Sequence, residues 1–252
     1  MCYNKKHRLP FVIERQFFMD ENLKKGRDQA MEEQENKLGT APIGKLLVQM
    51  SLPAITAQVI NALYNIVDRI YIGHIPGDGP MALTGVGVCM PIIMIVSAFA
   101  ALVSSGGAPR ASIYMGKGDH DTAEKILTGC LSLQIIVSII LTVILLIWNK
   151  DLLLMFGASE NTITYATAYM NIYAIGTIFV QITLGMNTFI TAQGKATTGM
   201  MTVLIGAVAN IILDPILIFG MFGLPRMGVA GAAAATVAGQ MVAAVLAVSL
   251  NH

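Results

Sequence analysis

Residues 127–149 read LTGCLSLQIIVSIILTVILLIWN, a run that contains no Asp, Glu, Lys or Arg. A helix needs about 20 predominantly apolar residues to cross the hydrocarbon core of a bilayer, and this run is long enough. Comparable charge-free runs cover residues 79–109, 161–194 and 227–251. Hydrophobic residues make up 55% of the chain, which leaves too little polar surface for the exterior of a large soluble enzyme. The sequence therefore predicts an all-α, polytopic membrane protein.

The hydropathy pattern predicts six transmembrane helices joined by short loops. Their expected ranges are about 46–72, 82–108, 126–148, 162–190, 197–221 and 228–250. Four basic residues fall in the loops on the same side as the N-terminus: Arg110, Lys117, Lys125 and Lys195. The opposite loops carry Lys150 and Arg226. Because Lys and Arg accumulate in cytoplasmic loops, we expect a plasma-membrane protein with its N-terminus in the cytoplasm.

The N-terminal region differs in composition from the rest of the chain. Sixteen of the 31 charged residues lie in the first 45 positions, with mixed sign and little periodicity. Residues 1–40 are therefore expected to form a disordered cytoplasmic tail, followed by a six-helix domain over residues 41–252. No signal peptide is expected, because no unbroken apolar run follows the basic start. The stretch Met31-Glu-Glu-Gln-Glu resembles an ordinary N-terminus, so an over-extended start over residues 1–30 stays open.

Two acids, Asp68 and Asp214, lie inside apolar segments, where an isolated carboxylate is costly and points to function. Asp68 ends a stripe of polar residues made of Gln58, Asn61, Asn65 and Asp68. At 100° per residue, these four side chains point within about 80° of one another on a helix. Asn210 precedes Asp214 by one helical turn. The pattern predicts a polar cavity inside a helical bundle, with the stripe on its wall and two acids beside it.

The residue after Asp214 adds a second polar feature to the fifth segment. Pro215 has no amide hydrogen, so inside a helix it leaves the carbonyl of Ile211 without its usual donor. This carbonyl, the Asn210 amide and the Asp214 carboxylate are oxygen ligands that suit Na⁺, or a carboxylic acid that exchanges protons. The alternative is a structural kink in which Asn210 satisfies the freed carbonyl.

The sixth segment is composed mainly of small residues. Gly231, Ala235 and Gly239 recur at every fourth position, which favours close packing of one helix on another. Thr236 places a hydroxyl in this segment. Taken alone, such a threonine is expected to bond the carbonyl one turn earlier in its own helix.

Residue spacing and net charge argue against a protease site, a metal or disulfide site, and a nucleic-acid site. Residues 116–119 spell GKGD, the GxGD string of intramembrane aspartyl proteases, but they lie in a charged loop and are interpreted as a turn before a helix. The three cysteines show no metal or disulfide spacing, and the four histidines are scattered. The net charge of +1 gives no reason to expect a nucleic-acid partner. We therefore expect no enzyme activity and no cofactor apart from a coupling ion.

Several short motifs occur in order over residues 40–250. They are Pro53-Ala-Ile-Thr, Leu63-Tyr-Asn-Ile-Val-Asp-Arg-Ile-Tyr-Ile-Gly, Gly106-Gly-Ala-Pro-Arg-Ala-Ser, Met115-Gly-Lys-Gly-Asp, Met155-Phe-Gly, Ala192-Gln-Gly, Ala209-Asn-Ile-Ile-Leu-Asp-Pro and Gly231-Ala-Ala-Ala-Ala-Thr. With these motifs the chain resembles the N-terminal half of a multidrug and toxic compound extrusion (MATE) transporter. The resemblance implies one six-helix lobe of a two-lobe transporter that exports organic cations in exchange for Na⁺ or H⁺. It also implies a coupling site made of Asp68, Asn210, Asp214 and Thr236, which could hold Na⁺.

The resemblance covers six helices where the family has twelve. The chain is therefore expected to be a fragment, a truncated gene product or a half-transporter that pairs with a second copy or a separate C-lobe. Two alternatives to organic cation efflux stay open. One is an inactive membrane fragment. The other is a lipid-linked oligosaccharide flippase of the same superfamily, which is disfavoured because Arg69 is the single basic residue within the predicted spans.

Overall fold

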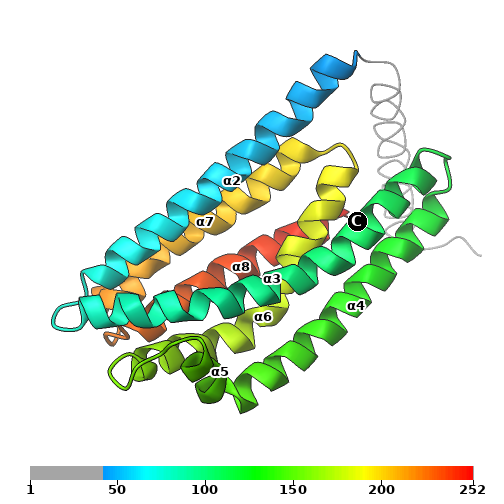
Figure 1. Ribbon diagram of the computed structural model, residues 1–252. Helices are drawn as coiled ribbons and strands as arrows, with labels where there is room; N and C mark the ends of the chain where they lie inside the picture. The colour runs from blue at the N-terminus through cyan, green and yellow to red at the C-terminus, as the bar shows by residue number, and fades with distance from the viewer. Residues whose placement is uncertain (1–41, 252) are drawn as a thin grey trace, which may run out of the picture. The chain divides into compact units, whose positions relative to one another are not determined.

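The computed structural model describes residues 42–251, and within this range the chain is helical and contains no strand (Figure 1). Six helices are long and apolar enough to cross a membrane: α2 (Ile43–Gly73), α3 (Gly79–Met115), α4 (His120–Ile147), α6 (Ile163–Ala192), α7 (Ala196–Phe219) and α8 (Val229–Asn251). The prediction of an all-α protein with six transmembrane helices is confirmed. The tail predicted over residues 1–40 lies outside the described residues.

The helices differ from the predicted spans mainly at their ends. α3 continues through Pro109 and past Arg110, because a charged residue ends an apolar run without ending the hydrogen bonding of a helix. A short helix, α5 (Asn149–Met155), follows α4 directly, and a 3₁₀ turn, η1 (Met221–Gly223), links α7 to α8. Neither was predicted, since each is too short to leave a periodic pattern.

The GKGD string forms a turn followed by a helix start, as predicted. Gly118 has φ +74°, a conformation that glycine adopts without strain. Asp119 caps α4 by accepting a hydrogen bond from the Thr122 amide at 3.1 Å. Hydrogen bonds from the Thr122 side chain and backbone hold the pKa of Asp119 below its usual value. The string therefore serves as a helix cap and lies outside the helices.

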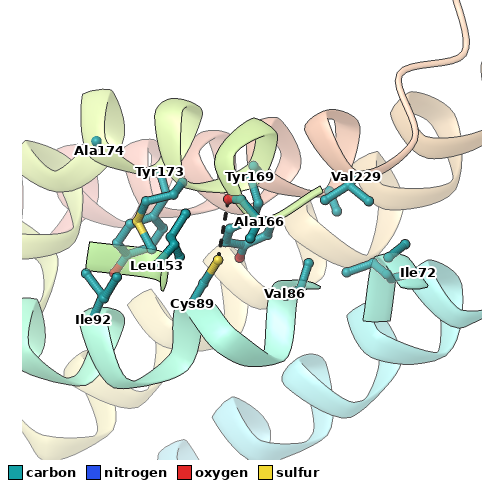
Figure 2. Packing of buried hydrophobic residues seen from close by; sticks show 14 of the residues in the cluster. Ile72, Val86, Cys89, Ile92, Leu153, Ala166, Tyr169, Tyr173, Ala174 and Val229 are labelled. Carbon is teal, nitrogen blue, oxygen red and sulfur yellow. Dashed lines mark hydrogen bonds between the residues drawn. The ribbon is translucent and has the colours of Figure 1, made fainter. Parts of the chain in front are cut away.

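From Val48 onward the helices form one unit in which α6 is the central element. Packed pairs connect α7 to α8, α8 to α6 and α6 to α4, and α3 packs against both α4 and α6. The core near one end includes Cys89 of α3, whose Sγ lies 3.5 Å from the carbonyl oxygen of Ala166 in α6 (Figure 2). Tyr169 and Tyr173 stack beside it with ring centroids 6.3 Å apart.

Small residues let α8 approach α7 closely, as the Gly231, Ala235 and Gly239 pattern predicted. A methyl group at Gly239 would lie 2.7 Å from the Gly206 carbonyl oxygen and 3.1 Å from Cβ of Asn210. A methyl group at Gly231 would meet the backbone of Leu217 in the same way. Glycine is therefore required for this contact, and the contact places the Thr236 side chain beside α7.

The last turns of α2 attach this helix to the rest of the unit. Ile72 is fully buried in the core, and the Tyr71 ring packs edge-on against Phe219 of α7 at 6.4 Å. In the following loop, the Pro76 carbonyl accepts a hydrogen bond of 3.1 Å from Arg226. These contacts hold Asp68, one turn before Ile72, close to α7.

Candidate functional site

The two acids of the apolar segments are both buried, although they come from different helices. Asp68 of α2 is 5% exposed, and Asp214 of α7 is fully buried. Tyr71, three residues after Asp68, packs on Phe219, five residues after Asp214, and this contact brings the two acid-bearing segments near each other. Two carboxylates that share a site of low dielectric repel each other, and a bound proton or cation relieves that repulsion.

Asn210 connects Asp214 to α8. Its amide nitrogen donates to Oδ1 of Asp214 and to Oγ1 of Thr236, each at 3.4 Å. Turning the amide over gives a shorter set, in which the nitrogen donates to Oδ2 of Asp214 at 3.3 Å and the oxygen accepts from the Thr236 amide at 3.1 Å. In both orientations Asn210 links the same two residues. The structure thus brings Asn210, Asp214 and Thr236 together.

These contacts discriminate between the two interpretations of the Asp214-Pro215 pair. In the kink interpretation, the Asn210 amide would bond the carbonyl of Ile211 that Pro215 leaves free. Within the described chain, the hydrogen bonds of that amide go to Asp214 and Thr236 instead. The Thr236 hydroxyl likewise faces Asn210, whereas the sequence alone favoured a bond to its own helix. The geometry is that of a shared polar site.

A cavity of about 770 Å³ lies beside the acids. Five of the seven residues predicted for the site line it: Gln58, Asn61, Asn65, Asn210 and Thr236. The other two, Asp68 and Asp214, are not part of the lining and lie behind it. The polar stripe of α2 therefore faces a cavity, as expected, but the acids are separated from its open space.

Sequence reasoning missed several polar residues of the cavity wall. Tyr64 of α2, Tyr169 of α6 and Gln240 of α8 line the cavity. Tyr64 shares the helical face of the polar stripe, so its position was open to prediction. Tyr169 lies in an apolar helix, and nothing in the local sequence links it to the cavity.

The donor set of this site suits a small hard cation or a proton. Among the described residues, no group of three or more His, Cys, Asp and Glu side chains could hold a metal ion. The site instead combines carboxylate, amide and hydroxyl oxygens, which fit Na⁺. Oδ1 of Asp68 is buried and has no hydrogen-bond partner in the described chain. An unpaired buried carboxylate oxygen needs a proton or a cation to offset its desolvation, so the residues present fit either ion.

The sequence of this chain is similar to those of known proteins. A family model described as MatE matches residues 53–216. The chain is 28% identical over 204 residues to the FAD transporter of Shewanella oneidensis, an alignment that covers 81% of this chain and 44% of that protein. It is 28% identical to the multidrug export protein MepA of Staphylococcus haemolyticus, with 77% and 42% covered.

The likeness extends to solved structures. A MOP superfamily transporter from Pyrococcus furiosus superposes with a TM-score of 0.72 and 27% identity, covering 81% of this chain and 43% of that one. A crystal structure of a MATE protein in the bent conformation gives a TM-score of 0.73 at 27% identity, with 81% and 44% covered. The chain thus spans less than half the length of these relatives.

Proposed function

Because the chain belongs to the MatE family, we propose that it forms the ion-coupling lobe of a secondary transporter that exports small organic cations in exchange for Na⁺ or H⁺. The relatives named above are transporters, and we infer that this chain likewise catalyses no reaction. It acts in the plasma membrane with its N-terminus in the cytoplasm. A second copy or a separate C-lobe completes the transport path.

One observation carries this proposal: buried Asp214 of α7 joins an amide and a hydroxyl beside a cavity, and a second buried acid, Asp68, lies on α2 next to α7. A stable membrane fold gains nothing from two nearby buried carboxylates, since each must be desolvated and they repel each other. A binding site gains from them, because a ligand with positive charge is attracted to both. The arrangement is therefore explained by ligand binding better than by folding.

The geometry also supports exchange of one positive ligand for another. An organic cation in the cavity and a proton or Na⁺ at Asp68 and Asp214 would neutralise the same pair of charges. Binding of the small ion then weakens binding of the organic cation, and the reverse holds by thermodynamic reciprocity. Such competition is the energetic basis of antiport.

The cavity wall favours cations over anions as substrates. It carries the aromatic rings of Tyr64, Tyr169 and Tyr173, and an aromatic face attracts a cation. No Lys or Arg of the described chain is among its lining residues. A dianionic substrate such as FAD would bring phosphate charges that usually pair with Arg or Lys. We therefore favour organic cations, although one relative is named as an FAD transporter.

The proposal can be tested with the purified full chain in lipid nanodiscs. Binding of ethidium is measured while Na⁺ is titrated against choline at constant pH, and then while pH is lowered without Na⁺. One of the two ions should weaken ethidium binding at least about tenfold, equivalent to about 1.4 kcal/mol of coupling. Asp68→Asn and Asp214→Asn should remove this dependence, whereas Asp121→Asn, an exposed acid of α4, should keep it.

Two results would count against the proposal. Ethidium binding that responds to neither ion in the unaltered chain would remove the coupling site. Tight FAD binding in place of ethidium binding would reassign the substrate class.

A further inference from the structure

A second polar cluster lies between α4 and α6, apart from the cavity. It is called here the α4–α6 seam and consists of Gln134, Ser138 and Thr142 of α4, Asn149 of α5, and Asn171, Gln181 and Gly185 of α6. Thr142 donates to the Ala174 carbonyl at 2.9 Å. Asn149 donates to Oδ1 of Asn171 at 2.6 Å. Proposed transport uses none of these residues.

The contacts along the seam define a regular antiparallel register. Gln134 lies against Gly185, where a methyl group would collide with its amide. Moving along α4 to Thr142 corresponds to moving back along α6 to Ala174. Ser138, one turn after Gln134, therefore comes opposite Gln181, one turn before Gly185. Gln134, Ser138 and Gln181 are all fully buried and occupy one short stretch of this interface.

The amide groups of this stretch are incompletely hydrogen-bonded. Among the described residues, neither amide atom of Gln134 has a partner, and Oε1 of Gln181 has none. The nitrogen of Gln181 donates to the Val96 carbonyl of α3 at 2.7 Å, which ties the seam to a third helix. The Ser138 hydroxyl donates to the Ile135 carbonyl at 2.7 Å, so its oxygen remains able to accept. The stretch thus presents free donors and free acceptors together.

We infer that a bound water molecule joins Gln134, Ser138 and Gln181 where α3, α4 and α6 meet. A cation would satisfy the carbonyl oxygens and leave the Gln134 N–H groups unpaired. An anion would do the reverse. Water both donates and accepts, and buried waters usually make about three hydrogen bonds to polar groups of this kind. Hydrocarbon around the bundle offers no other partner, so the need for such a molecule is greater than in a soluble protein.

The water site and the cavity use different faces of α6. At 100° per residue, Asn171 and Gly185 point roughly 160° away from the cavity-lining residues Tyr169 and Asn187, and Gln181 points about 120° away from them. None of Gln134, Ser138 and Gln181 lines the cavity. The role of the water site is to bind α3, α4 and α6 into one rigid block, whose other side carries the tyrosines of the cavity wall.

Hydration of the seam can be read directly by water-edited solid-state NMR. The full chain in lipid bilayers, labelled uniformly with ¹⁵N, is compared with Gln134→Leu to assign the Gln134 side-chain amide signal. That amide should receive magnetisation from water as fast as the amide of Gln58, which lines the cavity. Transfer as slow as that to the backbone amide of the fully buried Ala233 would overturn the inference.

Thermal stability gives an independent test, because the expected change in Tm has opposite signs for a hydrated and a dry Gln134 amide. If water pairs the Gln134 amide, Gln134→Leu removes hydrogen bonds and should lower Tm by about 2–4 °C. If the amide is dry and unpaired, the same change relieves its desolvation, and Tm should stay constant or rise. Gln49→Leu, an exposed position of α2, is the matched control and should shift Tm by less than about 1 °C. An unchanged or raised Tm for Gln134→Leu would contradict the water site.

Discussion

Two polar clusters lie within the apolar helices, yet they are built differently. One is the acid site, formed by Asp68, Asn210, Asp214 and Thr236, and the other is the α4–α6 seam. The acid site draws carboxylates from α2 and α7 and adjoins a cavity. The seam consists of neutral amides and hydroxyls packed between α3, α4 and α6, and none of its residues lines that cavity. Charge beside open space is suited to binding a ligand, whereas neutral polar groups in close contact are suited to joining helices.

The helices that carry the two clusters also differ in how many of their residues are buried. α2 buries Asp68 and Ile72, while α6 buries fourteen residues, from Ala166 to Ile190. Asp68 is thus carried on a helix with few buried residues, and the seam lies on the helix with the most. Substitutions in the acid site should therefore change ligand binding at little cost in stability. Substitutions in the seam should have the opposite effect.

The largest expected effect concerns the side of the membrane that the acid site approaches. Asp214 lies five residues before the end of α7 at Phe219, so the acid site is near the loop that contains Leu224. The bias of Lys and Arg predicts that this loop lies outside and the start of α4 inside. In a background without Cys2, Cys89 and Cys130, Leu224→Cys should react fully with an impermeant thiol reagent in intact cells.

The matched position for this test is His120, an exposed residue at the start of α4. His120→Cys should remain unlabelled until the cells are permeabilised. Both positions avoid the left-handed backbone of Gly118 and Gly223, where a cysteine would be strained. Labelling of His120→Cys and protection of Leu224→Cys would invert the topology and move the acid site toward the cytoplasm.

Neutralising Asp214 should weaken ion-dependent ligand binding without lowering stability. Asp214→Asn keeps the side-chain volume and removes a buried charge, so membrane insertion should be normal and Tm unchanged or higher. The ion-dependent part of ethidium binding should fall at least about tenfold. Fluorescence-detected gel filtration measures the first property and titration in nanodiscs the second. Loss of the folded protein with this substitution would assign Asp214 to the fold.

The acids were accessible to sequence reasoning because charge is rare within the spans. Asp68 and Asp214 stand out by composition alone, and helical periodicity connects Asp68 to Asn61 and Asn65. The link of Asn210 to Thr236 came from family resemblance, since no spacing within one helix reveals which helix packs beside it. The structure supplies that neighbour through the close contact at Gly239.

The seam left a weaker signal in the sequence. Gln134, Ser138 and Thr142 are spaced by four residues and form a stripe on one face of α4, which periodicity could have detected. Their partners on α6 could not be predicted, because Gln181 and Gly185 are recognised only through the antiparallel register. The cavity tyrosines were missed for a similar reason, since an aromatic residue in an apolar helix is consistent with an ordinary core.

Adding one methyl group to the seam should destabilise the protein. In Gly185→Ala the new Cβ collides with the Gln134 amide, and overpacking of this kind costs about 1–3 kcal/mol. Tm should therefore fall by several degrees, and the added change Gln134→Ala should restore part of the loss by removing the clash. Gly129→Ala in α4 has open space around its Cβ and serves as the control. Equal Tm values for the two alanine variants would mean that Gln134 does not pack on Gly185.

The smallest effect comes from a pair of threonines that hydrogen-bond across helices in the two clusters. Thr142 donates to the Ala174 carbonyl at 2.9 Å, and Thr236 lies 3.4 Å from the Asn210 amide nitrogen. Interhelical hydrogen bonds in membranes contribute about 0.6 kcal/mol on average, so Thr142→Val should lower Tm by only about 1–2 °C and leave ion competition intact. Thr236→Val should weaken that competition a few-fold with little change in Tm, because it removes an oxygen from the acid site. If both valines act on stability alone, Thr236 belongs with the seam as a structural contact, and the acid site reduces to Asp68, Asn210 and Asp214.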